Sequence, residues 1–552
     1  MESRKGALVR SASQWDRVVD VIVVGVGAGG CAAAVSASRQ GAETLLLEKL
    51  DTPGGTTRKS SGWYWVPNNR WMRERGIEDP KDAFLRYTAA LTRRESFNPA
   101  DPHLGLEPWE YALVESYYDH ASPVVDALTE MGALDGEVFW EFPDYYAHHE
   151  HNAAPYGRVV APKAAVEGER GTGEDLIRTL LAAAEREGVN LLVRHAVEQL
   201  VVDEDGRVLG VVADHAGNRV AIGARRAVIF ATGGYGQNPG LIRDLAAGPM
   251  MGSSAARGST GDFVRLATAL GAPLRCTGYP WMAPVVFERA LRNEETFWHT
   301  FQMPGDSSIL VNHFGIRANN EKLPYNEQAL THWAWDVKHA EFPNLLQFLV
   351  WDRYAQEHFT VQSPSNPIVA PGGDDAHIVR GDTLEELAQA LAGRLDSLAP
   401  HTGGVRLDPG FAGELAKSIR RFNEFAATGV DEDFQRGETP FEVFTNGWHG
   451  GPLRSETNRT MYPISTSGPY YAAIIAPGLL DTKGGPVTDT EGRVLDVDWK
   501  PIPGLYGVGN CVASPSGRAY WSGGATIGPA LTFGYLAGLS AARVPALELA
   551  EA

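Results

Sequence analysis

Apolar residues near the start of the chain follow two different periods. Residues 20–24 form a β-branched run typical of a strand, residues 25–30 are rich in glycine, and residues 31–40 have the small-residue pattern of a helix. A second apolar run at residues 44–47 predicts another strand. This order of strand, glycine turn, helix and strand predicts a βαβ unit and therefore an α/β fold.

The mixed pattern returns further along the chain. A helix is predicted at residues 173–187, and strand-like runs are predicted at 191–202, 208–212 and 227–230. A hairpin turn is predicted at residues 203–206, between the first two of these runs. In the tail, residues 504–507 predict a strand and residues 526–542 a glycine- and alanine-rich helix. Between about residues 279 and 477 the segments are aromatic-rich and punctuated by proline, with amphipathic helices at 383–395 and 409–428. We interpret this middle part as a second domain inserted into the first.

Composition narrows the class of protein. A chain of 552 residues is too long for one compact unit, and its net charge of −19 disfavours nucleic acid and anionic lipid surfaces as partners. No run of 18 apolar residues and no secretion signal are found, so no membrane span is expected. The three cysteines form no CxxC pair and suit a reducing compartment, which predicts a cytoplasmic protein.

The glycine turn matches the G-x-G-x-x-G pattern of dinucleotide-binding folds, directly after a strand and at the start of a helix. Gly25 makes the tight turn, Gly27 lets the backbone approach a pyrophosphate, and Gly30 permits close packing of the helix on the sheet. The N–H groups at the helix start favour that anion. Glu48, at the end of the second predicted strand, is placed to accept hydrogen bonds from the adenosine ribose.

Two further loops favour FAD over NAD as the nucleotide. A second small-residue loop runs from Gly54 to Gly62, and the strand 227–230 ends in an Ala-Thr-Gly-Gly turn typical of FAD proteins, although an ordinary strand end remains an alternative. No second G-x-G-x-x-G unit is present, so no NAD(P)H site is expected, and electrons should pass to an external acceptor that is quinone-like or oxygen. The helix that starts after Gly524 would stabilise negative charge on the reduced flavin, unless it is a plain glycine-rich helix start.

These patterns define the predicted FAD site and domains. The predicted cofactor-binding residues are Gly25, Gly27, Ala28, Gly29, Gly30, Glu48, Lys49, Gly54, Gly55, Thr56, Thr57, Ser60, Ser61, Gly62, Val197, Ala231, Thr232, Gly233, Asp262, Gly509, Asn510, Ala525, Thr526 and Ile527. The fold class is a discontinuous Rossmann-type FAD-binding domain, residues 14–285 and 481–552, with an inserted α+β capping domain that carries catalytic residues, 286–480.

Several motifs together resemble the fumarate reductase and succinate dehydrogenase flavoprotein superfamily, and within it the 3-ketosteroid Δ1-dehydrogenases. They are Gly54-Gly55-Thr56-Thr57 with Val66-Pro67-Asn68, Phe142-Pro143-Asp144-Tyr145-Tyr146, Asn320-Glu321-Lys322-Leu323-Pro324-Tyr325, Thr482-Lys483-Gly484-Gly485 and Ser516-Gly517-Arg518-Ala519-Tyr520. The likeness runs nearly from end to end.

Departures from the fumarate reductases are informative. Tyr325 and Trp521 stand where those enzymes have arginines that clamp a dicarboxylate, and Asp481 stands where they have a histidine. Without two guanidinium groups a small dianion loses its charge-assisted partners, which disfavours fumarate reduction. No histidine lies between Asp51 and Gly62, so a non-covalent flavin is expected.

The resemblance implies a set of catalytic roles for the desaturation of a cyclic ketone next to its carbonyl. The Tyr520 hydroxyl and the Gly524 N–H would bind the ketone oxygen, and Tyr325 would take the α-proton. Tyr146, or its neighbour Tyr145, would support that base. Because an ordinary tyrosine has a pKa of about 10, we expect an alkaline rate optimum or a phenol acidified by its neighbours.

The substrate and two different activities stay open at this stage. The segment 148–173 is shorter than in the steroid enzymes and Trp521 replaces a small or proline residue of theirs, so a monocyclic ketone is an alternative to a steroid. Arg158 would then pair with a substrate carboxylate, unless it is a solvated surface residue. The chain would also suit a flavin-dependent reductase of activated C=C bonds or a non-catalytic flavin-binding protein.

A few conspicuous side chains are interpreted as structural. The histidines at positions 148, 149 and 151 lack partners at a metal-ligand spacing, so no metal is expected. Residues 63–65 and 281–282 are rich in aromatics that are more often core than pocket, although by position they would also suit a substrate cavity.

Overall fold

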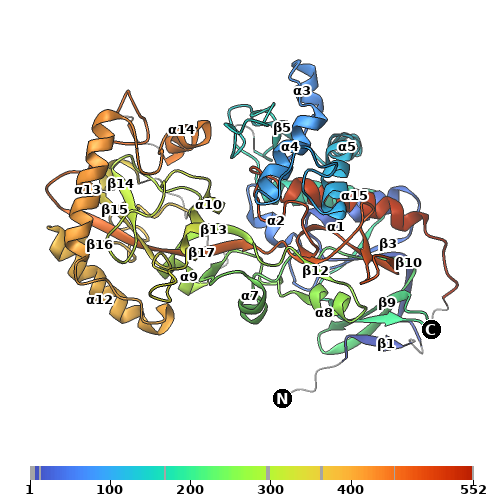
Figure 1. The fold of residues 1–552 in the computed structure, drawn as a ribbon. Helices are drawn as coiled ribbons and strands as arrows, with labels where there is room; N and C mark the ends of the chain where they lie inside the picture. The colour runs from blue at the N-terminus through green and yellow to red at the C-terminus, as the bar shows by residue number, and fades with distance from the viewer. Residues whose placement is uncertain are drawn as a thin grey trace. The chain divides into compact units, whose positions relative to one another are not determined.

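The computed structural model describes residues 6–10, 14–166, 169–293, 299–360, 365–449, 451–452 and 454–549. The chain divides into two compact units, each discontinuous in sequence. The larger unit comprises Met1–Ala247, Ala255–Pro280 and Asp481–Ala552, and the smaller unit comprises Gly248–Ser254 and Trp281–Leu480. Both combine helices with sheets (Figure 1), as the predicted fold class requires.

A nine-stranded mixed sheet forms the centre of the larger unit. Its strands are β1 (Leu8–Arg10), β2 (Arg17–Val24), β3 (Thr44–Leu47), β7 (Asn190–Leu192), β8 (Ala196–Val202), β9 (Val208–His215), β10 (Asn218–Phe230), β19 (Arg493–Leu495) and β20 (Pro501–Gly507). Strands β7, β3, β2, β10 and β20 lie in that order and run parallel. Strands β8, β9 and β10 pair antiparallel. Strand β10 serves both groups, because its first half pairs with β9 and its second half with β20.

The predicted βαβ unit is confirmed by β2, helix α1 (Ala28–Arg39) and β3, with β2 and β3 paired in parallel. All four residues of β3 are buried, as expected for a strand inside a parallel sheet. The turn into α1 depends on Gly25, whose φ of +100° is a conformation that L side chains rarely adopt.

Helix α15 (Ile527–Arg543) packs closely against α1. A Cβ on Gly534 would collide with the carbonyl oxygen of Gly29, and a Cβ on Gly538 would collide with that of Ala33. The Ser36 hydroxyl donates to the carbonyl oxygen of Tyr535 at 2.8 Å. The glycine-rich sequence of the last helix therefore lets two backbones approach where larger side chains would hold them apart.

Shorter elements surround this sheet in the larger unit. The helices are α2 (Gly55–Lys59), α3 (Arg70–Glu74), α4 (Lys81–Thr92), α5 (Pro108–Glu130), α6 (Gly173–Arg186), α7 (Pro239–Leu245), α8 (Asp262–Thr268) and the 3-10 turn η3 (Gly509–Cys511). One small sheet has the order β4 (Tyr64–Trp65), β6 (Val159–Pro162) and β5 (Gly136–Val138), and a second pairs β12 (Leu274–Arg275) with β18 (Gly485–Pro486). The first of these sheets joins the segment after the second glycine loop to residues 136–162.

A six-stranded sheet organises the smaller unit around the twelve-residue strand β17 (Tyr470–Asp481), which pairs with β11, β13, β15 and β16. The other elements are β11 (Gly252–Ser253), β13 (Trp281–Val286), α9 (Phe287–Arg292), β14 (Ser308–Val311), α10 (Tyr325–Leu330), η1 (Thr331–Trp333), β15 (Gln347–Asp352), α11 (Arg353–His358), β16 (Val379–Gly381), α12 (Leu384–Thr402), α13 (Phe411–Thr428), α14 (Pro440–Asn446) and η2 (Gly447–His449).

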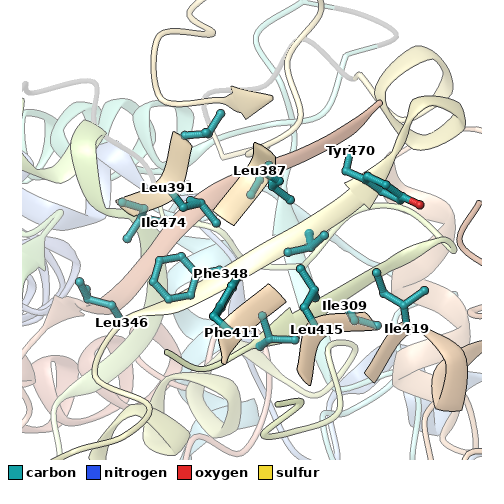
Figure 2. Packing of buried hydrophobic residues seen from close by; sticks show 14 of the residues in the cluster. Ile309, Leu346, Phe348, Leu387, Leu391, Phe411, Leu415, Ile419, Tyr470 and Ile474 are labelled. Carbon is teal, nitrogen blue, oxygen red and sulfur yellow. The ribbon is translucent and has the colours of Figure 1, made fainter. Parts of the chain in front are cut away.

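The core of the smaller unit lies between this sheet and the helices α12 and α13 (Figure 2). Leu387 and Leu391 of α12 and Leu415 and Ile419 of α13 point toward the sheet, where they meet residues such as Phe348. The four-residue spacing within each helix places one apolar stripe on the sheet. The predicted amphipathic helices are confirmed, although α12 continues seven residues past its predicted end to Thr402.

Among the residues that the structure describes, no helix is both long enough and apolar enough to span a membrane.

Candidate active site

In the glycine turn between β2 and α1, some glycines are required by the packing of the chain and others are not. A Cβ on Gly25 would collide with the Ala231 carbonyl oxygen, and a Cβ on Gly30 would collide with the Gly25 carbonyl oxygen. The packing of the chain on itself therefore requires both. A Cβ on Gly27 would approach no described residue beyond its chain neighbours closer than 3.6 Å, the distance to Thr57 Oγ1. A Cβ at Gly27 would thus make only ordinary van der Waals contacts, at the start of a helix where a phosphate is favoured.

Glu48 follows β3 and lies close to this turn. Its carboxylate accepts the N–H of Val26 at 3.3 Å and that of Leu50 at 3.0 Å. Burial raises the pKa of Glu48, while these N–H groups and Lys49 lower it in part. Lys49 in turn donates from Nζ to Asp262 Oδ2 at 2.7 Å. Two predicted cofactor residues, Lys49 and Asp262, are therefore brought together by the fold.

The second glycine loop contacts the start of α1. The N–H of Ala28 donates to Thr57 Oγ1 at 3.3 Å. Gly54 and Gly55 both have positive φ, so this loop turns where other residues are strained. The Ser60 hydroxyl closes the loop by accepting the N–H of Gly62 at 2.9 Å. Ser61, between them, is exposed.

Asp481 is a buried carboxylate that joins this second loop to the turn after β10. It accepts the N–H of Gly234 at 3.2 Å and the hydroxyls of Ser259 and Thr56 at 3.3 and 3.4 Å. Burial raises the pKa of Asp481, and the hydrogen bonds from Gly234, Thr482 and other groups offset part of that rise. The aspartate that replaces the fumarate reductase histidine thus links two loops predicted to hold the cofactor.

The remaining predicted cofactor residues lie at the ends of core elements of the larger unit. Ala231, Thr232 and Gly233 follow the end of β10, Gly509 and Asn510 begin η3, Ala525, Thr526 and Ile527 lead into α15, and Val197 is buried in β8. Asn510 also interacts with the Asp481 carboxylate.

Gly524 presents a backbone N–H that has no acceptor among the residues the structure describes. Its φ is +86°, and a Cβ there would approach the backbone of Tyr64 and Trp65 to 2.8 Å. Its carbonyl oxygen accepts the N–H of Trp65 at 3.1 Å and that of Gly528 at 2.9 Å. The Gly524 carbonyl is therefore held by two donors, while the Gly524 N–H, which belongs to the preceding peptide unit, is available to a ligand.

Tyr520 precedes this donor by four residues and is buried in the larger unit. Its ring contacts the ring of Tyr145 edge-on, with centroids 5.5 Å apart. Tyr145 also contacts Phe142, and it is buried, whereas Tyr146 is half-buried. The fold thus brings the Tyr145 ring against that of Tyr520.

Arg158 is neither a surface residue nor a ligand for a substrate carboxylate, in contrast to the two roles considered for it above. Its side chain is fully buried and pairs with Asp79 through two contacts of 2.9 and 2.6 Å and with Asp144 at 2.6 Å. Asp144 also accepts the indole N–H of Trp65 at 2.7 Å. We call Arg158, Asp79 and Asp144 the Arg158 cluster. It anchors the residue that immediately precedes Tyr145.

The tryptophans named from the sequence belong mainly to the core. Trp65 and Trp521 are fully buried, with ring centroids 5.6 Å apart. Trp521 donates from its indole to Thr92 Oγ1 at 3.3 Å. In the smaller unit Trp281 and Met282 are buried in β13. Trp521, which the resemblance predicts at the position of a clamp arginine, is thus a core side chain.

Tyr325 lies in the smaller unit, as the first residue of α10. Its ring contacts Phe301 edge-on, with centroids 5.0 Å apart, and its side chain is 7 % exposed. One turn later on the same helix, Gln328 donates to the carbonyl oxygens of Glu321 and Leu323 at 2.7 and 2.8 Å. These bonds hold the segment that leads into Tyr325.

A buried charge cluster lies immediately before Tyr325. Glu321 pairs with Arg317 at 2.9 Å and with Arg436 at 3.0 Å, and Arg317 also pairs with Asp431. Burial alone would raise the pKa of Glu321, but the two guanidinium groups outweigh it and lower that pKa to about 2. We call Glu321, Arg317 and Arg436 the Glu321 cluster. Sequence reasoning used Glu321 only as part of a motif and missed its partners, because Arg436 lies far along the chain.

Known proteins share this architecture. A family profile described as FAD binding domain matches residues 20–527. The "4-oxocyclohexanecarboxylate 2-dehydrogenase" of Sinomonas cyclohexanicum is 32 % identical, and the alignment covers 94 % of this chain and 92 % of that one. The "3-oxosteroid 1-dehydrogenase" of Mycolicibacterium smegmatis is 31 % identical, with 96 % and 98 % covered.

A solved structure agrees with these relatives. The chain is similar to the 3-ketosteroid delta1-dehydrogenase from Sterolibacterium denitrificans in complex with 1,4-androstadiene-3,17-dione, with a TM-score of 0.79 and 27 % identity. The match covers 95 % of this chain and 99 % of that chain. The predicted family resemblance, fold class and FAD cofactor are confirmed. The absence of a packing clash for a Cβ at Gly27, among the described residues, agrees with a glycine kept there for a dinucleotide cofactor.

Proposed function

Because this chain belongs to the FAD binding domain family, we propose that it is an FAD-dependent dehydrogenase that introduces a C=C bond next to the carbonyl of a cyclic ketone. The proposal is supported by near-full-length similarity to dehydrogenases whose names specify an oxocyclohexane and an oxosteroid. The single structural observation that carries it is the Gly524 N–H, which has no acceptor among the described residues and lies in the same loop as Tyr520.

In this proposal the larger unit holds both the cofactor and the ketone oxygen. The turn from Gly25 to Gly30 takes the pyrophosphate and Glu48 accepts the ribose hydroxyls. The flavin is bound non-covalently, and when bound it supplies the acceptor for the hydride leaving the β-carbon. The Tyr520 hydroxyl and the Gly524 N–H donate to the ketone oxygen and stabilise the negative charge that develops there.

Proton removal is assigned to Tyr325. An α-proton becomes more acidic once its carbonyl oxygen is hydrogen-bonded, and a phenolate is a strong enough base to take it. Because the pKa of an ordinary phenol is about 10, the rate of flavin reduction should rise with pH toward that value. Electrons then leave to an external acceptor, quinone-like or oxygen.

The test is anaerobic mixing of the FAD-loaded protein with cyclohexanone, 4-oxocyclohexanecarboxylate and androst-4-ene-3,17-dione. At least one ketone should bleach the visible absorption band of the oxidised flavin. Replacing Tyr520 by Phe should slow bleaching by about 10²–10³, and Y325F should slow it at least as much. The Y156F variant, at an exposed tyrosine, is the matched control and should leave the rate unchanged.

Two results would overturn the proposal. Reduced flavin that is reoxidised by an enone faster than the oxidised flavin is bleached by the ketone would identify a reductase of activated C=C bonds. A chain that binds FAD but responds to no cyclic ketone would be a non-catalytic flavin-binding protein.

A further inference from the structure

We propose that Asp481 is a positioning residue for FAD, whose carboxylate ties the turn after β10 to the second glycine loop in the arrangement that binds the cofactor. These two segments carry the predicted cofactor residues Gly233 and Thr56. The inference concerns FAD binding and not the ketone reaction, so either can fail while the other stands. Asp481 begins the last segment of the larger unit, and the residues that bind its carboxylate belong to the same unit.

Both oxygens of the Asp481 carboxylate accept backbone N–H groups. Oδ2 accepts the N–H of Gly234 at 3.2 Å, and Oδ1 accepts that of Thr482 at 2.8 Å. A Cβ on Gly234 would approach Oδ1 to 2.5 Å, so the turn after β10 lies directly against the carboxylate. Asp481 therefore fixes the backbone next to Gly233, one of the predicted cofactor residues.

Thr56 connects the second glycine loop to the same carboxylate. Its hydroxyl donates to Asp481 Oδ2 at 3.4 Å and accepts the N–H of Ala256 at 3.0 Å. The Ser259 hydroxyl also donates to Oδ2, at 3.3 Å. A threonine hydroxyl has a single hydrogen, and that of Thr56 is used for the aspartate. An acceptor at position 481 thus holds the helix α2 of this loop in place.

The surroundings of Asp481 favour its charged form. Its carboxylate is bound by neutral donors, which are backbone N–H groups, two hydroxyls and the side chain of Asn510. Such donors stabilise a carboxylate more than its protonated form. No lysine or arginine pairs with it in the part of the chain that the structure describes. The buried negative charge between the two segments should therefore disfavour an anionic reduced flavin relative to the neutral oxidised one.

The experiment measures the FAD dissociation constant of wild type, D481N and T56V from the flavin fluorescence released when each holoenzyme is diluted. Asparagine has the size of aspartate but turns an NH₂ group toward one of the two backbone N–H groups, so the D481N constant should rise at least about tenfold. T56V keeps the shape of threonine without its hydroxyl, and should raise the constant about three- to tenfold. The double variant should show less than the product of the two effects, because both changes remove the same contact.

The matched controls are D79N and T88V. Asp79 is also a buried carboxylate of the larger unit, but its partner is Arg158. Thr88 is buried as well, and its hydroxyl donates to carbonyl oxygens of its own helix. D79N should lower the stability of the protein, yet both controls should keep the FAD dissociation constant within about twofold of wild type. Constants for D481N and T56V that also stay within that range would overturn the proposal.

The midpoint potential of the bound flavin separates positioning of the cofactor from general support of the fold. D481N removes a negative charge, so the preference for reduced over oxidised flavin should rise at least about tenfold, a shift of about +30 mV for two electrons. T56V keeps the charge and should leave the potential unchanged. Anaerobic reduction beside a reference dye measures it. A D481N potential equal to or below that of wild type would refute the role of Asp481 beside the cofactor. If D481N yields no folded holoenzyme, equal FAD affinities in T56V and T88V would refute it.

Discussion

Each unit holds a tyrosine-bearing loop with buried arginine, but the balance of charge differs between the two clusters. In the Arg158 cluster one guanidinium serves two carboxylates, Asp79 and Asp144. In the Glu321 cluster two guanidinium groups contact one carboxylate, and one of them, Arg317, also pairs with the buried carboxylate of Asp431. The pKa values respond accordingly. Burial raises the pKa of Asp144 and Arg158 offsets only part of that rise, whereas the pKa of Glu321 is lowered to about 2.

The difference shows that the pKa of a buried carboxylate depends on all the charged groups around it and not on one partner alone. A buried charge left without a partner costs several kcal/mol, so each cluster is sensitive to the loss of its scarcer charge. That charge is the cation in the Arg158 cluster, and in the Glu321 cluster it is Glu321, the carboxylate that pairs with Arg436 while Asp431 pairs with Arg317. Three predictions test this contrast.

The largest effect is expected for R158M. It leaves Asp79 and Asp144 buried without a cation, and should lower the free energy of unfolding of the larger unit by about 3–5 kcal/mol. Urea unfolding followed by tryptophan fluorescence measures the loss. R39M is the matched control, because the Arg39 side chain is 62 % exposed, and it should change stability by less than about 0.5 kcal/mol. Similar losses in the two variants would contradict the importance of the buried cation.

A second prediction compares the anions. E321Q removes the carboxylate that pairs with the buried Arg436 and leaves Arg317 with Asp431 alone, so it should cost about 3 kcal/mol. D144N leaves Arg158 paired with Asp79 through two contacts, and should cost about 1–2 kcal/mol. The same unfolding measurement ranks them. A larger loss in D144N than in E321Q would show that charge balance does not govern these clusters.

The smallest effect is a difference in acid sensitivity. The pKa of Glu321 is about 2 when folded and about 4.5 otherwise, so its stabilisation is complete above about pH 4.5 and is lost as the pH falls toward 2. The raised pKa of Asp144 acts with the opposite sign, because the folded state takes up that proton more readily. Between about pH 5 and pH 3, E321Q should therefore lose less additional stability than wild type, and D144N slightly more. Parallel pH profiles for all three chains would refute the assignment.

The local pattern of apolar and polar residues was sufficient to predict most of the helices and strands that position the cofactor. The predicted strand 44–47 is β3 (Thr44–Leu47), and the predicted helix 526–542 is α15 (Ile527–Arg543). Such segments could be predicted because the periods of buried positions are properties of neighbouring residues. The end of α12 was predicted too early, because its apolar stripe follows the sheet beneath it past Leu395.

Long-range contacts could not be predicted in the same way. Arg158 was expected at the surface, yet its partners Asp79 and Asp144 lie 79 and 14 positions away. Nothing in the neighbouring sequence of Arg158 distinguishes a buried arginine from a solvated one. The roles of Tyr325, Tyr520 and Gly524 remain proposals that the kinetic experiments test.

The sequence by itself determined the family, the βαβ unit and the FAD cofactor, because these depend on short motifs whose glycines and strand spacing are local. Only the tertiary structure decided that the Tyr145 ring contacts Tyr520, and that Trp65 is fully buried while Trp63 is half-buried. Adjacent residues with the same side chain are alike in sequence. Their burial and contacts differ only because the fold packs different side chains around each of them.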